Sequence, residues 1–535
     1  MKDSRGGDTW WLGWGKDVPT RGAVWSDGGH LSLFGEHGAL SPSGRFAVVG
    51  DSEGDLADMA QGWEEQGYEY LQRVQFFFAI AVWDFQEKCL WLGRDGVGGK
   101  TLYYTWQGST LWVAARLRSL RSYHPRKLHW VALRDYLCCA FVPGTQTLWQ
   151  GVHQLAPGTL WRLPHQETRI FWQPTVHQPP LPSDDLDTYA QDLRRLLTQV
   201  VSEKLAGASQ VGIFLSGGID SSAIAALSAQ IHSPKPIAYS IHFGKNLPNE
   251  LAFSSLVAQH CGLEHILLEI SFKDMWRFLP ETMLHLDQPI GDPLTVPNWL
   301  LAKQARSRVS CILNGEGGDP CFGGPKNQPM LLSQTYGYDL ITSYGRSFQK
   351  CFDDLPQLLH PEIWTAVKDA PFFFAPDLTD NSAELLQRLF LINIKFKGAN
   401  HILTKVNNLL GSAGLQGRSP LFDPRVVDFS LRIPTTYKVQ GAEEKVVLKR
   451  AVADLLPPAI LHRPKSGMMV PVQQGFREHW QGAARHLLCH KNAQIAPYIQ
   501  TTTVQNWLNY QGDPWHRYGV KLWLLTSLEI WLQQN

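Results

Sequence analysis

Short apolar runs alternate with helix-like segments between residues 210 and 315. The runs that predict strands lie at residues 211–215, 237–243, 265–270 and 309–313. Such alternation is typical of a parallel sheet whose crossover helices cover its faces. In sheets of this kind, ligands bind at the carboxyl ends of the strands. The loops that follow the first and the last of these strands are therefore the first candidates for chemistry.

The rest of the pattern divides the chain into two parts. Up to about residue 170, short apolar alternations separated by glycine-containing turns predict a strand-rich domain. Residues 173–185 contain four prolines and predict a linker. Apolar side chains at helical spacing over 186–205, and a helical pattern from about residue 329 onward, follow. We predict a β-rich domain over 1–172, the linker, and an α/β domain over 186–535 that includes an additional helical stretch near 328–396.

Composition narrows the class of protein without naming its chemistry. The chain has 535 residues, of which 44% are hydrophobic and 18% charged, and a net charge of +1. A near-neutral chain offers no electrostatic reason to bind nucleic acid or an anionic membrane, and no apolar run is long enough to span a bilayer. The first residues lack the apolar core of a signal peptide. We therefore expect a cytoplasmic protein whose eight cysteines, which show no CxxC pairing, are free thiols.

The most informative motif follows the apolar run that ends at Leu215. It reads Ser216-Gly217-Gly218-Ile219-Asp220-Ser221-Ser222 and leads into an apolar, helix-like segment. Two glycines allow a tight turn, and serine hydroxyls, loop N–H groups and a helix N-terminus can hold a phosphate. Asp220 would repel phosphates unless a cation bridges them, and Mg²⁺ accepts carboxylate and phosphate oxygens together. The Gly-Lys-Ser/Thr ending of a Walker loop is missing, so the motif predicts a phosphate-binding turn of another kind.

This motif resembles the ATP pyrophosphatase loop of the asparagine synthetase family, which includes β-lactam synthetases and the macrolactam cyclases that close lasso peptides. Residues 314–324 resemble the family's second loop, although Pro320 stands where a glutamate is usual. The resemblance implies that Asp319 and Asp220 hold Mg²⁺ on the phosphates of ATP and that Glu316 is a candidate base near the reacting amine. The ATP-binding residues that it implies are Leu215, Ser216, Gly217, Gly218, Asp220, Ser221, Ser222, Ile241, Asn314 and Gly315.

Further matches lie outside these two loops. Residues 415–424 resemble a segment that shapes the synthetase site, where Arg418 could position a carboxylate or could be a buried structural arginine. Asp292 lies in a loop near the substrate side and could touch Mg²⁺ or the substrate, although helix capping is the role that we favour for it. Residues 445–450 and 463–468 resemble the family's C-terminal run. That match implies that Lys465 stabilises charge on the adenylate or the tetrahedral intermediate, with Arg463 as a second candidate.

The N-terminal part resembles the family's glutaminase domain only in places. Residues 78–84 and 93–104 match its second half. The resemblance implies an α/β protein in which a degenerate, Ntn-type glutaminase-like α+β domain precedes an ATP-pyrophosphatase (adenine nucleotide alpha hydrolase-like) parallel sheet. Glutamine-dependent relatives carry a nucleophilic cysteine after the initiator Met, whereas Lys2 stands here, and the segments that hold glutamine are absent. Asp51 resembles the glutamine-site aspartate and is expected to lack partners, so we expect glutamine hydrolysis to be lost.

The reaction implied by the resemblance is adenylation of a carboxylate by ATP, release of pyrophosphate, and attack by an amine to form an amide. Two amine sources remain open. The substrate can carry the amine, as in β-lactam or lasso-peptide cyclisation, which we favour, or free ammonia can convert aspartate to asparagine. A catalytically inactive nucleotide-binding scaffold is the alternative of another class. The expected partners are a small-molecule or peptide carboxylate and, for a cyclase, a precursor peptide with its protease and leader-binding proteins; the oligomeric state stays open.

Overall fold

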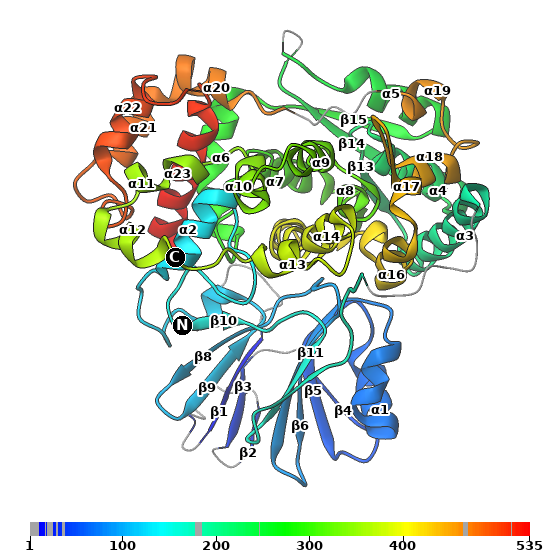
Figure 1. The fold of residues 1–535 in the computed structure, drawn as a ribbon. Coiled ribbons are helices and arrows are strands. Elements are labelled where there is room, and N and C mark those ends of the chain that lie inside the picture. The colour runs from blue at the N-terminus through cyan, green and yellow to red at the C-terminus, as the bar shows by residue number, and fades with distance from the viewer. Residues whose placement is uncertain are drawn as a thin grey trace. The chain divides into compact units, whose positions relative to one another are not determined.

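A computed structural model describes residues 10–15, 18, 25–27, 30–34, 38–176, 185–244, 247–463, 469–514 and 516–535. The chain divides into two compact units (Figure 1). The first consists of residues 1–133, 142–175 and 395–404, and the second of residues 134–141, 176–394 and 405–535. Most of the predicted linker, residues 177–184, lies outside the described residues.

The first unit contains two six-stranded antiparallel sheets. One has the order β10 (Val152–Gln154), β8 (Tyr103–Gln107), β9 (Thr110–Ala114), β1 (Trp11–Trp14), β3 (Leu31–Phe34) and β2 (Trp25–Asp27). The other has the order β12 (Glu167–Ile170), β11 (Thr159–Leu163), β7 (Cys89–Arg94), β6 (Phe78–Asp84), β5 (Phe46–Ser52) and β4 (Gly38–Leu40). A buried cluster that includes Leu12 and Val113 from one sheet and Ala81 and Leu92 from the other forms the core between them.

Strand β6 shows why its sequence is apolar at almost every position. Ala81 and Trp83 point into the core that the two sheets share. Ile80 and Val82 point the opposite way, into a second core under helix α1 (Leu56–Gln66), which contacts β4 and β5 (Figure 1). Because side chains alternate along a strand, a strand covered on both faces must be apolar throughout.

The second unit is built on a five-stranded parallel sheet. Its order is β15 (Glu264–Glu269), β14 (Ile237–His242), β13 (Val211–Phe214), β16 (Cys311–Leu313) and β17 (Gln416–Arg418). The four predicted strands are confirmed, each to within two residues, and β17 was not predicted. The helices between these strands are α4 (Ile219–Ile231), α5 (Leu251–Cys261), α6 (Phe272–His285) and α7 (Thr295–Ala305), of which α5 and α7 contact β14.

The strand order of this sheet places a topological switch point between β13 and β16. The chain runs outward from β13 through β14 to β15, and then returns to the other side of β13 to form β16. In open parallel sheets, ligands bind outside the carboxyl ends of the strands at such a switch point. The two motifs singled out in the sequence, residues 216–222 and 314–324, follow these two strands.

Helices supply most of the remaining second unit, as the pattern after residue 329 predicts. Preceding the sheet are α2 (Trp130–Cys139) and α3 (Leu186–Leu205), the latter a confirmed prediction. Following β16 are α8 (Gly318–Phe322), α9 (Asn327–Thr335), α10 (Leu340–Ser347), α11 (Leu355–Leu358), α12 (Pro361–Val367), α13 (Ala375–Thr379), α14 (Leu385–Ile392), a π-helical segment (Asn393–Ile402) that belongs largely to the first unit, α15 (Leu403–Ser412), α16 (Pro424–Arg432), α17 (Thr435–Lys438), α18 (Val446–Ala451), α19 (Pro458–Leu461), α20 (Val472–Gly475), a second π-helical segment (Phe476–Trp480), α21 (Gln481–Leu488), α22 (Thr501–Leu508) and α23 (Tyr518–Gln534), with a short hairpin of β18 (Val439–Gln440) and β19 (Glu443–Glu444).

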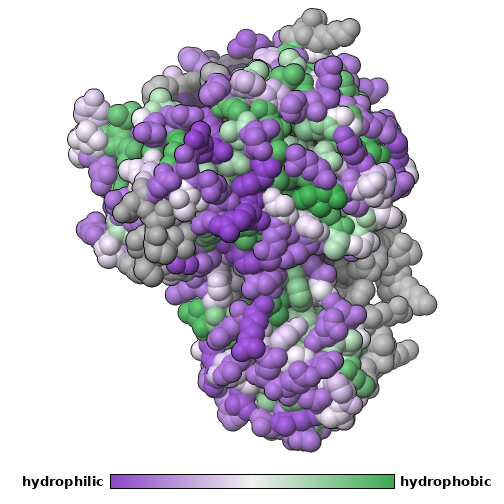
Figure 2. Space-filling view, turned by 90° about the vertical axis from the view of Figure 1, so that its right-hand side faces the viewer, coloured by the Kyte–Doolittle hydropathy of each residue, from purple (hydrophilic) through white to green (hydrophobic). Residues whose placement is uncertain are grey.

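The C-terminal helix α23 is buried on all sides. Trp523 and Trp531 are fully buried on it, which accounts for part of the high tryptophan content. The eight cysteines are free thiols, as predicted, and six of them are buried. In the part of the chain that the structure describes, no helix combines the length and the apolar character needed to cross a bilayer. The face seen in Figure 2 mixes hydrophilic and hydrophobic residues in small patches, as on ordinary globular proteins.

Candidate active site

The two loops at the switch point touch each other through their backbones. A Cβ added to Gly315 would lie 2.4 Å from the amide nitrogen of Ser221, so that position accepts only glycine. Gly217 has a φ of +77°, and a Cβ there would lie 2.5 Å from the amide nitrogen of Ser254 at the start of α5. These glycines are therefore required by close approach as well as by the turn itself. The sequence-predicted loops form one site.

The serine hydroxyls of the first loop hold the turn at the N-terminus of α4. The Oγ of Ser221 accepts a hydrogen bond from the Ser216 amide (3.2 Å) and lies 3.1 Å from the Ser216 Oγ. Ser222 is fully buried, and its Oγ has no hydrogen-bond partner among the described residues. Because the first N–H groups of a helix also lack partners within the helix, this end of α4 can accept a phosphate.

The residues predicted to contact adenosine lie at the neighbouring strand ends. The Leu215 amide donates to the Tyr239 carbonyl (2.9 Å), and Ile241 is buried on β14. Asn314 follows β16, and its Oδ1 accepts a hydrogen bond from the Glu316 amide (3.0 Å). Within the described chain the buried Nδ2 of Asn314 has no acceptor. The structure thus brings these predicted ATP-binding positions to the same edge of the sheet as the loops.

The predicted metal ligands Asp220 and Asp319 share one lysine. The Nζ of Lys445 lies 2.5 Å from the Oδ2 of Asp220 and 2.6 Å from the Oδ1 of Asp319, and its side chain is 2% exposed. Burial lowers the pKa of Lys445, but the two carboxylates outweigh it and raise the pKa above its ordinary value. Lys445 has a φ of +61° at the start of α18. The sequence places Lys445 in a segment that resembles the family's C-terminal run, but nothing in that segment indicates contact with two carboxylates more than 100 residues away.

The donor set around Asp220 fits a hard cation such as Mg²⁺. Its Oδ1 is buried and finds no hydrogen-bond donor in the described part of the chain. A Cβ on Gly318 would lie 2.1 Å from the Cγ of Asp220, so this glycine makes room for the carboxylate. Two carboxylates from two loops, one with an unsatisfied oxygen, match the preference of Mg²⁺ for oxygen ligands supplemented by phosphate.

The side chain of Glu316 lies beside a second buried lysine. Its Oε1 is 4.0 Å from the Nζ of Lys405 on α15, and that Nζ is 3.2 Å from the Oδ2 of Asp292. The side chain of Lys405 is 5% exposed, whereas that of Glu316 is 35% exposed and can be reached by a substrate. The structure therefore places two predicted residues, Glu316 and Asp292, on one cation that sequence reasoning missed.

Arg463 reaches back to the first loop. Its Nη1 donates to the Gly217 carbonyl (2.9 Å), its Nη2 pairs with Glu250, and its guanidinium lies over the Phe253 ring with 4.0 Å to the centroid. These contacts fix the tight turn of the loop from outside. Lys465, predicted as the charge-stabilising lysine, lies outside the described residues, and its role stays a prediction.

Arg418 lies on β17, an edge strand of the parallel sheet. Its Nη1 donates to the Lys204 carbonyl and its Nη2 to the Oε1 of Gln416 (2.7 Å). These contacts fit the structural alternative, and a substrate role for Arg418 stays a prediction.

In the first unit, Asp51 has an ionic partner, which corrects the expectation that it has none. The Nζ of Lys100 lies 3.0 Å from the Oδ1 of Asp51. Burial lowers the pKa of Lys100, but Asp51 and Glu53 outweigh it and raise that pKa. An ammonium of the chain is thus already paired with the Asp51 carboxylate.

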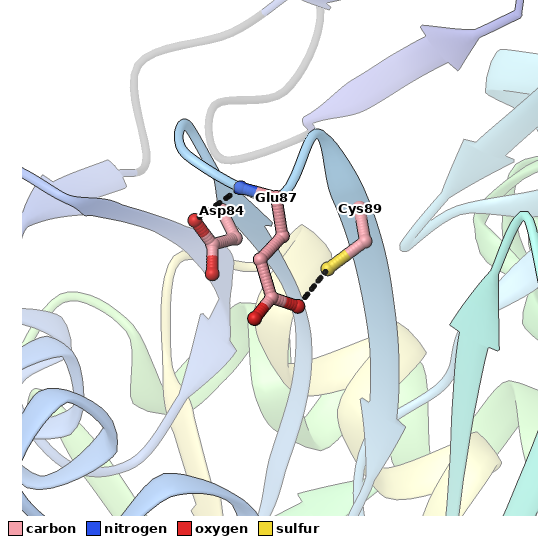
Figure 3. A group of neighbouring side chains, drawn as sticks. All are labelled: Asp84, Glu87 and Cys89. Carbon is pink, nitrogen blue, oxygen red and sulfur yellow. Dashed lines mark hydrogen bonds between the residues drawn. The ribbon is translucent and has the colours of Figure 1, made fainter.

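Asp84, Glu87 and Cys89 form the group of potential metal ligands found among the described residues (Figure 3). Arg45 lies 2.8 Å from the Oδ2 of Asp84, and Arg162 lies 2.6 Å from the Oε2 of Glu87. Burial raises the pKa of the Cys89 thiol, which keeps it protonated. Two arginines already balance the two carboxylates, so the group is a structural ion-pair cluster of the first unit.

A glycine-serine loop at the switch point of a parallel sheet, facing two carboxylates and buried lysines, defines a nucleotide-dependent α/β enzyme. A family model described as asparagine synthase matches residues 192–533, and one described as glutamine amidotransferase domain matches residues 45–172. The chain belongs to the asparagine synthase family and is an ATP-dependent carbon–nitrogen ligase. The resemblance seen in the sequence and the predicted fold class are thereby confirmed.

Curated relatives extend over most of the chain. Putative asparagine synthetases (glutamine-hydrolyzing) of Mycobacterium bovis and Mycobacterium tuberculosis are each 30% identical, over 93% of this chain and 81% of the relative. Asparagine synthetase (glutamine-hydrolyzing) 1 of Bacillus subtilis is 24% identical, over 87% of this chain and 79% of the relative.

Proposed function

We propose that this protein activates a carboxylate with ATP and Mg²⁺ and transfers the acyl group to an amine that its first unit does not release from glutamine. The observation that carries the proposal is the pair Asp220 and Asp319 around Lys445, beside a phosphate-binding turn. This site has the groups needed to hold a triphosphate and its cation together.

In the first step the substrate carboxylate attacks the α-phosphorus of ATP, and the bond to pyrophosphate breaks. The loop of residues 216–222 and the N-terminus of α4 bind phosphate oxygens. Asp220 and Asp319 would hold Mg²⁺, which would neutralise charge on the leaving pyrophosphate. Lys445, which contacts both carboxylates, is the candidate cation for the phosphate oxygens beside them.

In the second step an amine attacks the acyl carbonyl, and the bond to AMP breaks. The amine loses a proton, and the half-exposed carboxylate of Glu316 is the candidate acceptor on this side of the loop. Lys465 and Arg463 are the candidate cations for the charge that develops on the acyl and phosphate oxygens.

The first candidate is a substrate that carries its own amine, so that the reaction closes a ring as in β-lactam or lasso-peptide formation. The pairing of Lys100 with Asp51 favours it, because the aspartate that would hold glutamine is already neutralised. The helices α9 to α14 add surface near the second loop in sequence, where a larger substrate can be bound. A precursor peptide with its protease and leader-binding proteins would then be the partners.

The second candidate is synthesis of asparagine from aspartate with ammonia. The relatives named asparagine synthetase favour it, since they match most of the chain. Incubation with ATP, Mg²⁺ and aspartate, with ammonium chloride or glutamine as the nitrogen source, separates the candidates. Asparagine formed with ammonium but not with glutamine establishes the second. Asparagine formed equally well from glutamine contradicts the proposed loss of glutaminase activity, and absence of AMP with aspartate favours the first.

A further inference from the structure

The acceptor side of the site holds an arrangement that the proposed function does not use. Lys405 lies on α15, directly after the π-helical segment Asn393–Ile402, a rare geometry that is frequent at functional sites. Its ammonium is buried between Asp292 at 3.2 Å and Glu316 at 4.0 Å. A buried ammonium shared by two carboxylates from two loops is costly to build unless each partner is held in place.

Asp292 is held by hydrogen bonds in the turn that precedes α7. Its Oδ1 accepts a hydrogen bond from the Leu294 amide (3.0 Å), and its carbonyl accepts one from the Thr295 hydroxyl (2.5 Å). Its Oδ2 therefore faces Lys405 in a fixed direction. Asp292 thus holds the turn that leads into α7 and also anchors Lys405, while Leu294 is the N-cap residue of the helix.

The backbone of Glu316 is held by a hydrogen bond, whereas its carboxylate is not held in this way by any described residue. Its amide donates to Asn314, while its carboxylate extends to the partly exposed side of the loop, within reach of Lys405. We infer that Lys405, fixed by Asp292, is a positioning residue that aims the Glu316 carboxylate at the attacking amine for proton transfer. The inference rests on the proposed function, because it assigns Lys405 to the second step of that reaction.

Electrostatics of the neighbourhood agree with this assignment. Burial lowers the pKa of Lys405, but Asp292 and Glu316 outweigh it and raise the pKa, so the lysine stays charged at neutral pH. Lys350 also faces Asp292, and burial lowers its pKa; Arg517 faces Lys350 in turn. Lys405 is therefore the buried cation that lies beside the Glu316 carboxylate.

The test compares the two half-reactions in the full-length K405M and K405R variants. ATP–pyrophosphate exchange with L-aspartate reports the first step, and aspartyl transfer to ammonium or to hydroxylamine reports the second. Hydroxylamine is neutral near pH 7.5 and needs no base before it attacks. We expect K405M to keep exchange within about threefold, to lose about tenfold or more in transfer to ammonium, and to lose less with hydroxylamine. K405R should recover most of the loss.

The control is K521M, which removes another buried lysine that two carboxylates share. Lys521 lies 2.6 Å from Asp354 and 3.3 Å from Asp513, outside the residues of the site. K521M should lower stability and leave transfer per folded molecule unchanged. Equal losses of exchange and transfer in K405M, or no recovery in K405R, would overturn the assignment of Lys405 to the second step.

A second measurement needs no substrate and keeps the failure of the inference separate from the failure of the proposed function. Without Lys405, Asp292 and Glu316 lose the cation that both contact, so K405M should be less stable than the wild type, and the deficit should grow as pH rises from about 5 to about 8. D292N in the K405M background should remove part of this deficit. A difference in stability between K405M and the wild type that does not depend on pH overturns the inference, whatever the substrate is. Absence of exchange in the wild type shows only that aspartate is not the substrate.

Discussion

Removal of Lys445 is the perturbation whose magnitude the structure defines best. K445M leaves Asp220 and Asp319 facing each other without the ammonium that lies 2.5 and 2.6 Å from them. Removing one partner of a buried ion pair costs about 3–5 kcal/mol. The two carboxylates are 18% and 29% exposed and retain some solvation, so we expect the lower end, about 3 kcal/mol in the free energy of unfolding of the second unit.

The pH dependence follows from the same contacts. The pKa of Lys445 is raised in the folded state, so its stabilising contribution is fully present below its unfolded pKa and is constant between about pH 5 and 9. In K445M the two carboxylates face each other without a cation, so their mutual repulsion should lower the stability of the fold more at pH 8 than at pH 5.

Urea unfolding followed by tryptophan fluorescence at pH 5 and pH 8, with and without Mg²⁺, measures these effects. Mg²⁺ should recover more stability in K445M than in the wild type, because it binds the carboxylates that the lysine leaves. The matched control is K449M on the same helix, whose partly exposed pair with Glu443 is worth at most about 1 kcal/mol. A loss in K445M no larger than in K449M, or a loss independent of pH and Mg²⁺, would refute the reasoning.

Three further variants test individual parts of the site. G318A adds a Cβ 2.1 Å from Asp220 and should abolish ATP–pyrophosphate exchange. The control G482A, where no atom lies within 4 Å of the added Cβ, should leave exchange unchanged. Exchange retained in G318A would mean that the Asp220 carboxylate can move. R463K loses the planar contacts to the loop carbonyl and the aromatic ring, so the KM for ATP should rise about tenfold. An unchanged KM would mean that Arg463 does not support ATP binding by the loop. E316Q should keep exchange and lose about 10²-fold or more in amide formation, and equal loss of both steps would place Glu316 in the first.

Much of the second unit could be predicted because its strands are short, apolar and flanked by helical patterns. The exception is β17, whose residues Gln416–Arg418 include no apolar side chain and pair along one side only. Such an edge strand has no burial signal of its own and is specified by the strand beside it.

The two loops of the site were predictable because each follows a strand directly. The two lysines were not. Lys445 lies at the start of α18 and Lys405 lies within α15, both far along the chain from the first loop. Only the fold brings Lys445 to Asp220 and Lys405 to Glu316. Asp292 was singled out as part of a loop near the substrate side, and the structure adds Lys405 as the partner of its Oδ2.

Carboxylate-dependent exchange of pyrophosphate into ATP tests the central claim most directly, because it needs the nucleotide, the cation and the substrate carboxylate together but no amine. With a panel of amino-acid and peptide carboxylates, the wild type should catalyse exchange with at least one of them, and D220N should lose it about 10²-fold or more. Exchange that D220N retains in full, or none from the wild type with any carboxylate while ATP still binds, would contradict the account.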